Sequence, residues 1–183
     1  KNENIASGDL LDLMRRAKWF GINLARLDIR QESSRHSQLI SEFVRGKFNK
    51  DYAKFSEKQK LDFLKLHIKS KTNRIKNFQF KNRENKEVWS TFKALSQEPS
   101  ECLGAYVISM TTSASDILSI SFLQKEANIK NKLRVVPLFE TLDDLINAKP
   151  IMETLFSQSW YRKLINFDQE VMICLLYTSP SPR

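Results

Sequence analysis

The sequence predicts an α/β protein that is predominantly α-helical, in which short strands alternate with helices. Three observations lead to this class. The chain of 183 residues contains only 4 Gly and 5 Pro, so it has few of the residues that make tight turns, which argues against an all-β sandwich. Its hydrophobic fraction of 41% is sufficient for a buried core. Its second half repeats a unit in which a short apolar run is followed by a helix-capping pattern.

The first predicted elements are a helix and a strand. The segment from Gly8 to Phe20 has apolar residues at helical spacing, and Ser7 is its candidate N-cap. The apolar face consists of Leu10, Leu11, Met14 and Ala17. In the next segment, from Leu24 to Arg30, apolar and charged residues alternate with the period of a strand.

Two strand–helix units are predicted in the second half. Residues 105–110 (AYVISM) form a continuous apolar run, as in a strand buried on both faces, and residues 133–139 are also strand-like. Each run is followed by a capping-box pattern, which predicts the start of a helix. The two patterns are Ser113 with Asp116 and Thr141 with Asp144.

The remaining elements extend this alternation. Pro150 is expected to end or kink the helix that begins near Thr141, residues 151–165 predict a further helical pair, and residues 170–173 begin another strand. Such an order predicts parallel strands with right-handed connections, and both a TIM-type barrel and a doubly wound sheet fit it. No Gly-rich phosphate loop follows any of these strands, which argues against a Rossmann or P-loop protein.

The net charge of +9 is concentrated in one stretch. Residues 31–100 contain 16 Lys and Arg against 8 Asp and Glu, whereas the rest of the chain contains 14 against 13. The stretch is predicted to form helices at 37–45, 56–70 and 84–95. A basic nucleic-acid-binding module is therefore an alternative function. No zinc-finger, RNP-like or helix-turn-helix motif accompanies the charge, so no sequence motif supports this alternative. Lysines on solvent-exposed helical faces explain the charge better.

The residues at the ends of the predicted strands are the candidate site. The strands end at Arg30, at residues 110–113 and at Glu140. In a barrel the chemistry lies where the strands end. An arginine fork suits a phosphate or carboxylate, and a glutamate is a hard oxygen ligand for Mg²⁺ or Mn²⁺. Together they indicate an anionic, phosphorylated substrate.

Simpler interpretations of these residues remain open at this point. Arg26, Asp28 and Arg30 fit the solvent face of an edge strand, and Glu140 fits the capping region of the next helix. His36 and His67 have no partner at a defined spacing, which favours structural or exposed roles.

The cellular setting is predicted from what the chain lacks. Cys102 and Cys174 make neither a disulfide framework nor a metal-ligand spacing, which favours a reducing, cytoplasmic compartment. No apolar run is long enough to cross a bilayer, and there is no secretory leader, so we expect no membrane partner. The first residue is Lys1, not Met, which indicates a piece of a longer protein.

Five segments resemble phosphoenolpyruvate carboxylase of the bacterial type. They occur in the family's order and are IASGDLLDLMRR (5–16), LARLDIRQESSRH (24–36), AYVISMTTSASDIL (105–118), VVPLFETLDDL (135–145) and WYRKLI (160–165). The resemblance extends from about Asn4 to Ile173 and is looser in the helical stretch. It implies a partial TIM (β/α)8 barrel with large helical insertions, the basic residues 31–100 being one of them.

The resemblance also implies a reaction and the roles of individual residues. The family carboxylates phosphoenolpyruvate with bicarbonate, giving oxaloacetate and phosphate. The arginine of its DIRQES motif binds the substrate phosphate and corresponds to Arg30, and the glutamate of its PLFET motif binds the essential Mg²⁺ or Mn²⁺ and corresponds to Glu140. Arg35 and His36 belong to the same block as Arg30 and are expected to shape the site. The family's catalytic histidine lies upstream, so no catalytic residue is assigned within this chain.

The resemblance stops abruptly after Ile173. The family continues with the motif Gly-Tyr-Ser-Asp-Ser, in which the aspartate is the second metal ligand, and then with a lysine. This chain reads CLLYTSPSPR at those positions. Residues 174–183 are therefore predicted to be a non-native tail, and residues 1–173 a fragment of the barrel that is inactive alone. The parent enzyme is expected to be a cytoplasmic homotetramer.

Overall fold

A computed structural model of the chain describes residues 8–20 and 25–174. Its single sheet contains four strands in the order β1-β2-β3-β4, and every neighbouring pair is parallel. The strands are β1 (Leu27–Glu32), β2 (Leu103–Ser109), β3 (Arg134–Phe139) and β4 (Met172–Ile173). The predicted α/β class and the parallel strands are therefore confirmed. The predicted N-cap Ser7, residue Leu24 and residues 175–183 of the predicted tail lie outside the described residues.

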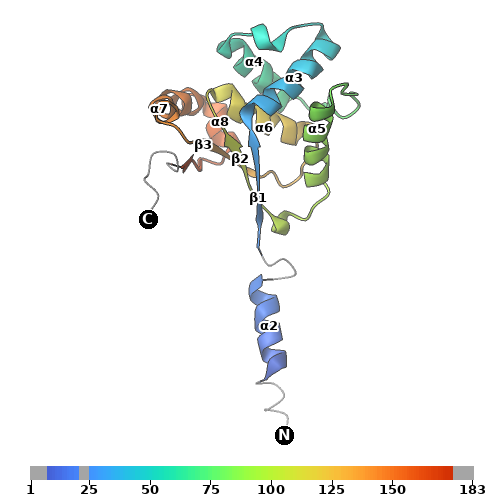
Figure 1. The fold of residues 1–183 in the computed structure, drawn as a ribbon, viewed down its shortest axis with the longest axis vertical. Coiled ribbons are helices and arrows are strands. Elements are labelled where there is room, and N and C mark those ends of the chain that lie inside the picture. The colour runs from blue at the N-terminus through green and yellow to red at the C-terminus, as the bar shows by residue number, and fades with distance from the viewer. Residues whose placement is uncertain (1–7, 21–24, 175–183) are drawn as a thin grey trace, which may run out of the picture.

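Helices fill the connections between the strands (Figure 1). The helices between β1 and β2 are α3 (Ser33–Phe48), α4 (Glu57–Lys69) and α5 (Arg83–Leu95), with short 3-10 turns η1 (Tyr52–Lys54) and η2 (Ser100–Cys102). The others are α2 (Asp9–Phe20), α6 (Ala114–Glu126), α7 (Leu142–Phe156) and α8 (Ser159–Leu164). Figure 1 draws α2 apart from the other elements, and the apolar side chains Leu10 and Met14 of its predicted face are exposed. In the part of the chain described, no helix is long and apolar enough to cross a membrane.

Pro150 was expected to end or kink the helix; it does not end it, because α7 continues through it to Phe156, and the kink stays a prediction. A proline inside a helix removes one backbone hydrogen bond and costs about 3 kcal/mol. The turns after it bury Ile151, Met152 and Leu155 in the core. We infer that this apolar burial offsets the cost of the proline.

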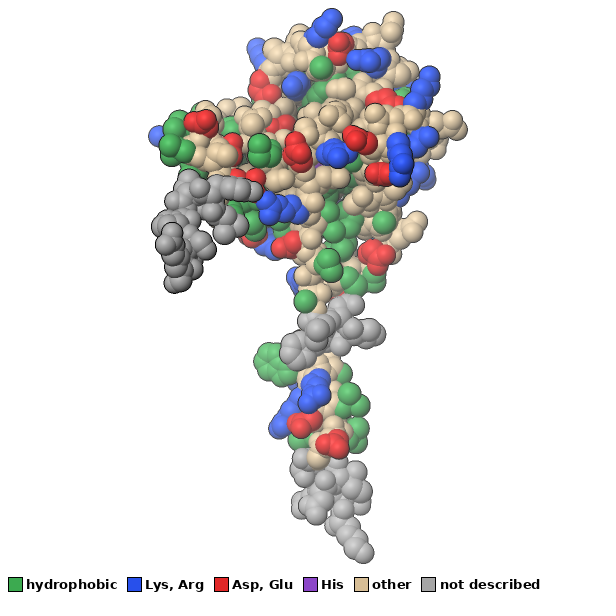
Figure 2. Space-filling view, viewed as in Figure 1, with side chains coloured by type: hydrophobic (Ala, Val, Ile, Leu, Met, Phe, Trp, Pro, Cys, Tyr) green, Lys and Arg blue, Asp and Glu red, His purple; other side chains and the backbone are tan. Residues whose placement is uncertain are grey.

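The main core lies between the sheet and the helices, with α6 at its centre. Nearly all side chains of α6 are buried, and α3, α4 and α7 pack around it. Aromatic side chains of the basic stretch join this core: Phe43 lies edge-to-face with Phe48 and Phe78, and tilted against Phe122 of α6. On the face shown in Figure 2, basic side chains are spread over the helical part and interspersed with acidic ones. Basic and acidic side chains thus alternate on solvent-exposed helical faces, which is the arrangement that the sequence favoured for the basic stretch.

A carboxylate of β1 fixes the register between β1 and β2. The pairing shifts between Leu27 and Ile29, and at this irregularity the Asp28 side chain accepts a hydrogen bond of 2.7 Å from the backbone N–H of Ala105. The same carboxylate lies where a Cβ atom on Gly104 would stand, so a larger residue at that position would force the Asp28 side chain to move away from its hydrogen bond to Ala105.

We expect Gly104→Ala to lower the free energy of unfolding by about 1–3 kcal/mol, because the added methyl overlaps the Asp28 carboxylate. Urea unfolding of the 183-residue chain measures this loss. In an Asp28→Ala background the carboxylate is gone, so Gly104→Ala should then cost much less. Equal losses in both backgrounds would contradict the proposed steric origin.

Candidate functional site

The candidate site lies at the carboxyl ends of β1, β2 and β3, which parallel pairing brings to one edge of the sheet. In this register Arg30 is opposite Val107 and Ile108 is opposite Pro137. Glu140 follows the last residue of β3 directly. The first strand was predicted to end at Arg30, but β1 continues to Glu32 because Gln31 and Glu32 pair with Ile108 and Ser109 of β2.

Arg30 and Glu140 form an ion pair across this edge although 110 residues separate them in sequence. The guanidinium Nη2 of Arg30 donates a hydrogen bond to Oε1 of Glu140. The Arg30 side chain is 56% exposed, whereas that of Glu140 is only 10% exposed. Arg30 thus has guanidinium surface free for a ligand, and Glu140 presents a nearly buried carboxylate beside it.

Other residues cap the N-terminus of α7, so a capping role does not explain the position of the Glu140 side chain. The Asp144 carboxylate accepts the backbone N–H groups of Glu140 and Thr141, at 3.2 and 3.0 Å. Thr141 Oγ1 accepts the N–H of Asp144 at 3.1 Å, which completes the predicted capping box. The side chain of Glu140 is therefore left to pair with Arg30.

The second strand end is held by a contact that sequence reasoning missed. Met110 follows β2 with a left-handed φ of 55°, and its carbonyl accepts a hydrogen bond of 2.6 Å from the hydroxyl of Ser33 in α3. A positive φ is uncommon for a residue other than glycine. The turn out of β2 is thus tied to the start of the helix that follows β1.

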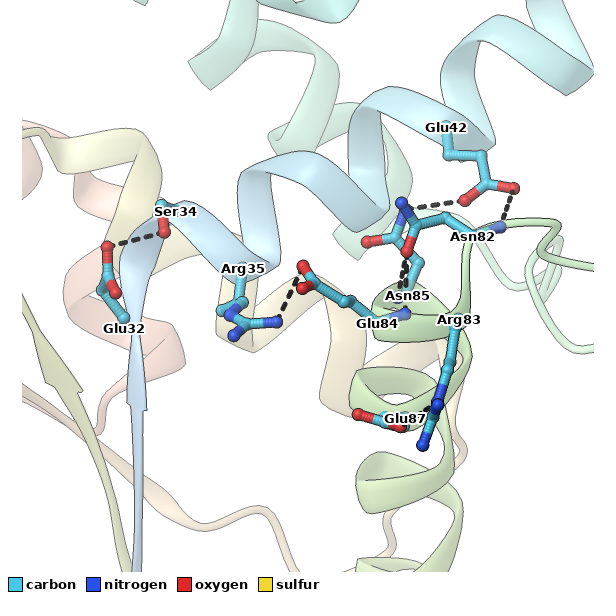
Figure 3. Close-up of polar contacts among 9 residues, drawn as sticks. All are labelled: Glu32, Ser34, Arg35, Glu42, Asn82, Arg83, Glu84, Asn85 and Glu87. Carbon is cyan, nitrogen blue, oxygen red and sulfur yellow. Dashed lines mark hydrogen bonds and ion pairs between the residues drawn. The ribbon is translucent and has the colours of Figure 1, made fainter.

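Arg35 lies on α3 and faces α5. Its guanidinium forms a 2.8 Å ion pair with Glu84 of α5, and both side chains are partly exposed (Figure 3). Figure 3 also shows Glu42 of α3 bound to Asn85 of α5, at 2.6 Å. Among the described residues Arg35 makes no ion pair with the Arg30–Glu140 edge, and its observed contacts join two helices.

His36 is fully buried beneath β1 and β2. Its Nε2 lies 2.8 Å from the Tyr106 hydroxyl and 3.1 Å from Oε1 of Gln31, and the Tyr106 hydroxyl donates to the same Gln31 oxygen at 2.9 Å. This pattern assigns the proton of the neutral imidazole to Nε2. His36 Nδ1 has no hydrogen-bond partner in the described part of the chain, and burial lowers the pKa of His36 to about 3.

A family model for phosphoenolpyruvate carboxylase matches residues 1–176 of this chain. The chain belongs to the phosphoenolpyruvate carboxylase family. The phosphoenolpyruvate carboxylase of Photorhabdus laumondii is 45% identical over 171 residues, which is 93% of this chain and 20% of that protein. That of Aliivibrio salmonicida is 47% identical over 169 residues, and the C4 phosphoenolpyruvate carboxylase of Flaveria trinervia is 45% identical over 169 residues. The last two alignments each cover 92% of this chain, and the chain spans about a fifth of the length of all three curated relatives.

Phosphoenolpyruvate carboxylases are generally metal-dependent, so we asked which of the described residues could bind a metal ion. Glu140 offers one nearly buried oxygen ligand. Within residues 8–20 and 25–174, however, no group of three His, Cys, Asp or Glu side chains is placed to hold a metal ion. The described residues therefore do not complete a metal site.

Proposed function

We propose that this chain is part of an enzyme that carboxylates phosphoenolpyruvate with bicarbonate, giving oxaloacetate and inorganic phosphate. The observation that carries the proposal is the Arg30–Glu140 pair at the carboxyl edge of a parallel sheet, in a chain of this family. Four parallel strands in sequence order, joined by helices, also support a partial TIM barrel that the longer protein closes. Family membership favours this function over the basic nucleic-acid-binding module.

In this proposal Arg30 binds the phosphate of the substrate. Its guanidinium is a planar fork that matches two phosphate oxygens, and more than half of the side chain is open to a ligand. The ion pair with the neighbouring Glu140 carboxylate orients the Arg30 guanidinium. As negative charge moves between the phosphate and the enolate oxygen, a fixed cation here lowers the energy of the transition state. Arg30 holds and orients the substrate and transfers no proton.

We further propose that Glu140 is one ligand of an Mg²⁺ or Mn²⁺ ion whose other ligands lie outside the described residues. Because the observed residues alone do not complete the site, no step of the reaction is assigned to the metal here. We retain the prediction that residues 174–183 are a non-native tail. A genomic DNA read that encodes CLLYTSPSPR in frame would refute that prediction.

The longer protein is proposed to be a cytoplasmic homotetramer that takes phosphoenolpyruvate and bicarbonate as substrates. Arg35 and His36 are proposed to support the site indirectly. His36 contributes by fixing Gln31, the residue after Arg30 on β1, through the Tyr106 network.

Two proteins test the proposed function. The 183-residue chain alone is expected to release no phosphate from phosphoenolpyruvate in a bicarbonate-dependent manner, because it supplies one substrate contact and one metal ligand. A chimeric enzyme, in which residues 4–173 replace the aligned segment of the Photorhabdus laumondii protein, is expected to form oxaloacetate. A folded chimeric enzyme without carboxylase activity, beside an active parent, would refute the proposal, as would activity of the isolated chain.

A further inference from the structure

A cavity lies among α3, α4 and the segments that precede and follow α4, and no strand contributes to its lining. Its volume is about 510 Å³, within the range of small-molecule sites. The residues that matter for its chemistry are Phe48, Phe55, Phe63, Lys50, His67 and Arg74. None of them belongs to the strand-end site, so the inference is independent of the proposed carboxylase function.

One wall of this cavity is aromatic. The rings of Phe48 and Phe63 meet edge-to-face at 5.9 Å, and those of Phe55 and Phe63 at 6.3 Å. All three side chains are only partly buried by the core. An aromatic wall of this kind favours a flat apolar group, which stacks or packs edge-on against the rings.

The rim of the cavity carries an excess of positive charge. Lys50 and Arg74 line it together with a single carboxylate, Asp62. Within the described ranges neither cation takes part in an ion pair, whereas the exposed Arg35 and Arg83 are both paired. The arrangement leaves an uncompensated charge that a monoanion would balance.

The loop that carries Arg74 is held in place before any ligand binds. The backbone N–H groups of Arg74 and Ile75 both donate to the buried Glu126 carboxylate of α6, the second at 2.7 Å. Lys125 donates to the Thr72 carbonyl of the same loop. The Arg74 guanidinium lies 5.9 Å from the centre of the Phe48 ring. A fixed loop reduces the entropy that binding would otherwise cost.

His67 adds a hydrogen-bonding side chain to the wall of the cavity. It lines the cavity and is only 4% exposed, yet its ring makes no hydrogen bond within the described part of the chain. The ring packs against Phe63 at 4.3 Å. Burial, and then the charge of Arg74, lower the pKa of His67, so that the neutral ring has one donor and one acceptor to offer. No ring nitrogen of His67 is among the fully enclosed unpartnered polar atoms of the described residues, so the ring reaches the open space of the cavity and can hydrogen-bond to a ligand there.

We propose that this cavity binds a small aromatic carboxylate, with its ring against the three phenylalanines and its carboxylate on Arg74. The Arg74 fork matches a carboxylate, and His67 hydrogen-bonds to the same ligand. Asp62 disfavours a doubly charged anion at this position. The site is separate from the substrate site, which makes it a candidate effector site on the helical stretch.

The test uses 2-naphthoate as a fluorescent probe of the 183-residue chain. We expect saturable binding that the uncharged 2-naphthamide and the ring-free acetate do not reproduce. Arg74→Gln should weaken 2-naphthoate binding about tenfold, because it removes a charge-assisted pair. Lys71→Gln, on the same loop but outside the cavity lining, is the matched control and should leave the affinity unchanged. Far-UV circular dichroism checks that each variant is folded, and Lys50→Gln replaces Arg74→Gln if that variant is not.

Three results would overturn the proposal. The first is the absence of saturable binding, and the second is equal affinity for 2-naphthoate and 2-naphthamide. The third is binding to the isolated chain but not to the chimeric enzyme, which would show that another segment of the longer protein occupies the cavity. Binding by a chimeric enzyme that lacks carboxylase activity would support this site while refuting the proposed function.

Discussion

Replacing Arg30 by glutamine in the chimeric enzyme is expected to lower kcat/KM for phosphoenolpyruvate by roughly 10²–10³-fold, the usual cost of removing one group that stabilises transition-state charge. Glutamine keeps a hydrogen-bond donor but has no charge and no fork. The loss should appear in KM and in kcat, because the phosphate is bound in the ground state and its charge changes during the reaction. A coupled assay for oxaloacetate measures both.

Two further variants separate the fork of Arg30 from its charge. Arg30→Lys keeps the charge and loses bidentate geometry, so it should fall between the wild type and Arg30→Gln. Arg26→Gln is the matched control, since Arg26 is also exposed but lies before the amino end of β1. Wild-type kinetics in Arg30→Gln, or an equal loss in Arg26→Gln, would show that Arg30 does not bind the substrate.

Much of the fold was predictable because its determinants are local. The capping pair of Thr141 and Asp144 and the apolar run of β2 each lie within a few residues. The structure has the capping box at the predicted pair, and it has β2 at Leu103–Ser109 where 105–110 was predicted. Strand limits were less predictable. The end of β1 is set by pairing of Gln31 and Glu32 with β2, about 77 residues away, and no local pattern contains that information. Tertiary burial likewise overrides the helix-ending tendency of Pro150.

The candidate site was predictable only in part, for a related physical reason. Arg30 and Glu140 were found from residue chemistry at strand ends, and the parallel sheet brings them together. The contacts that hold their surroundings join residues far apart in the chain. For example, the Ser33 hydroxyl donates a hydrogen bond to the Met110 carbonyl. The Glu57 carboxylate likewise accepts a hydrogen bond from the backbone N–H of Ser115. Neither serine has a sequence signature that distinguishes it from an exposed one.

The buried His36 is expected to make the fold acid-sensitive. Its pKa is about 3 in the folded chain and 6.5 in the unfolded chain, so between these values the unfolded chain binds a proton that the folded chain does not. The free energy of unfolding should therefore fall as pH falls below 6.5, by about 1.4 kcal/mol per pH unit from this group, and by about 4 kcal/mol in all by pH 3. The physical reason is burial, which removes the charged imidazolium from water, and the protonated Nδ1 would be a buried donor without an acceptor among the described residues.

Urea unfolding of the 183-residue chain between pH 7 and pH 4 measures this slope, and His36→Gln serves as the comparison. Glutamine can still donate to Tyr106 but cannot titrate, so the variant should be less stable at pH 7 and lose less stability on acidification. His67→Gln is the matched control and should retain the part of the slope that comes from His36. If His36→Gln does not fold, the ring resonances of His36 in the native chain decide the matter. A titration of those resonances near pH 6.5 in the folded protein would show that His36 is solvated and that the Tyr106 network does not keep it neutral.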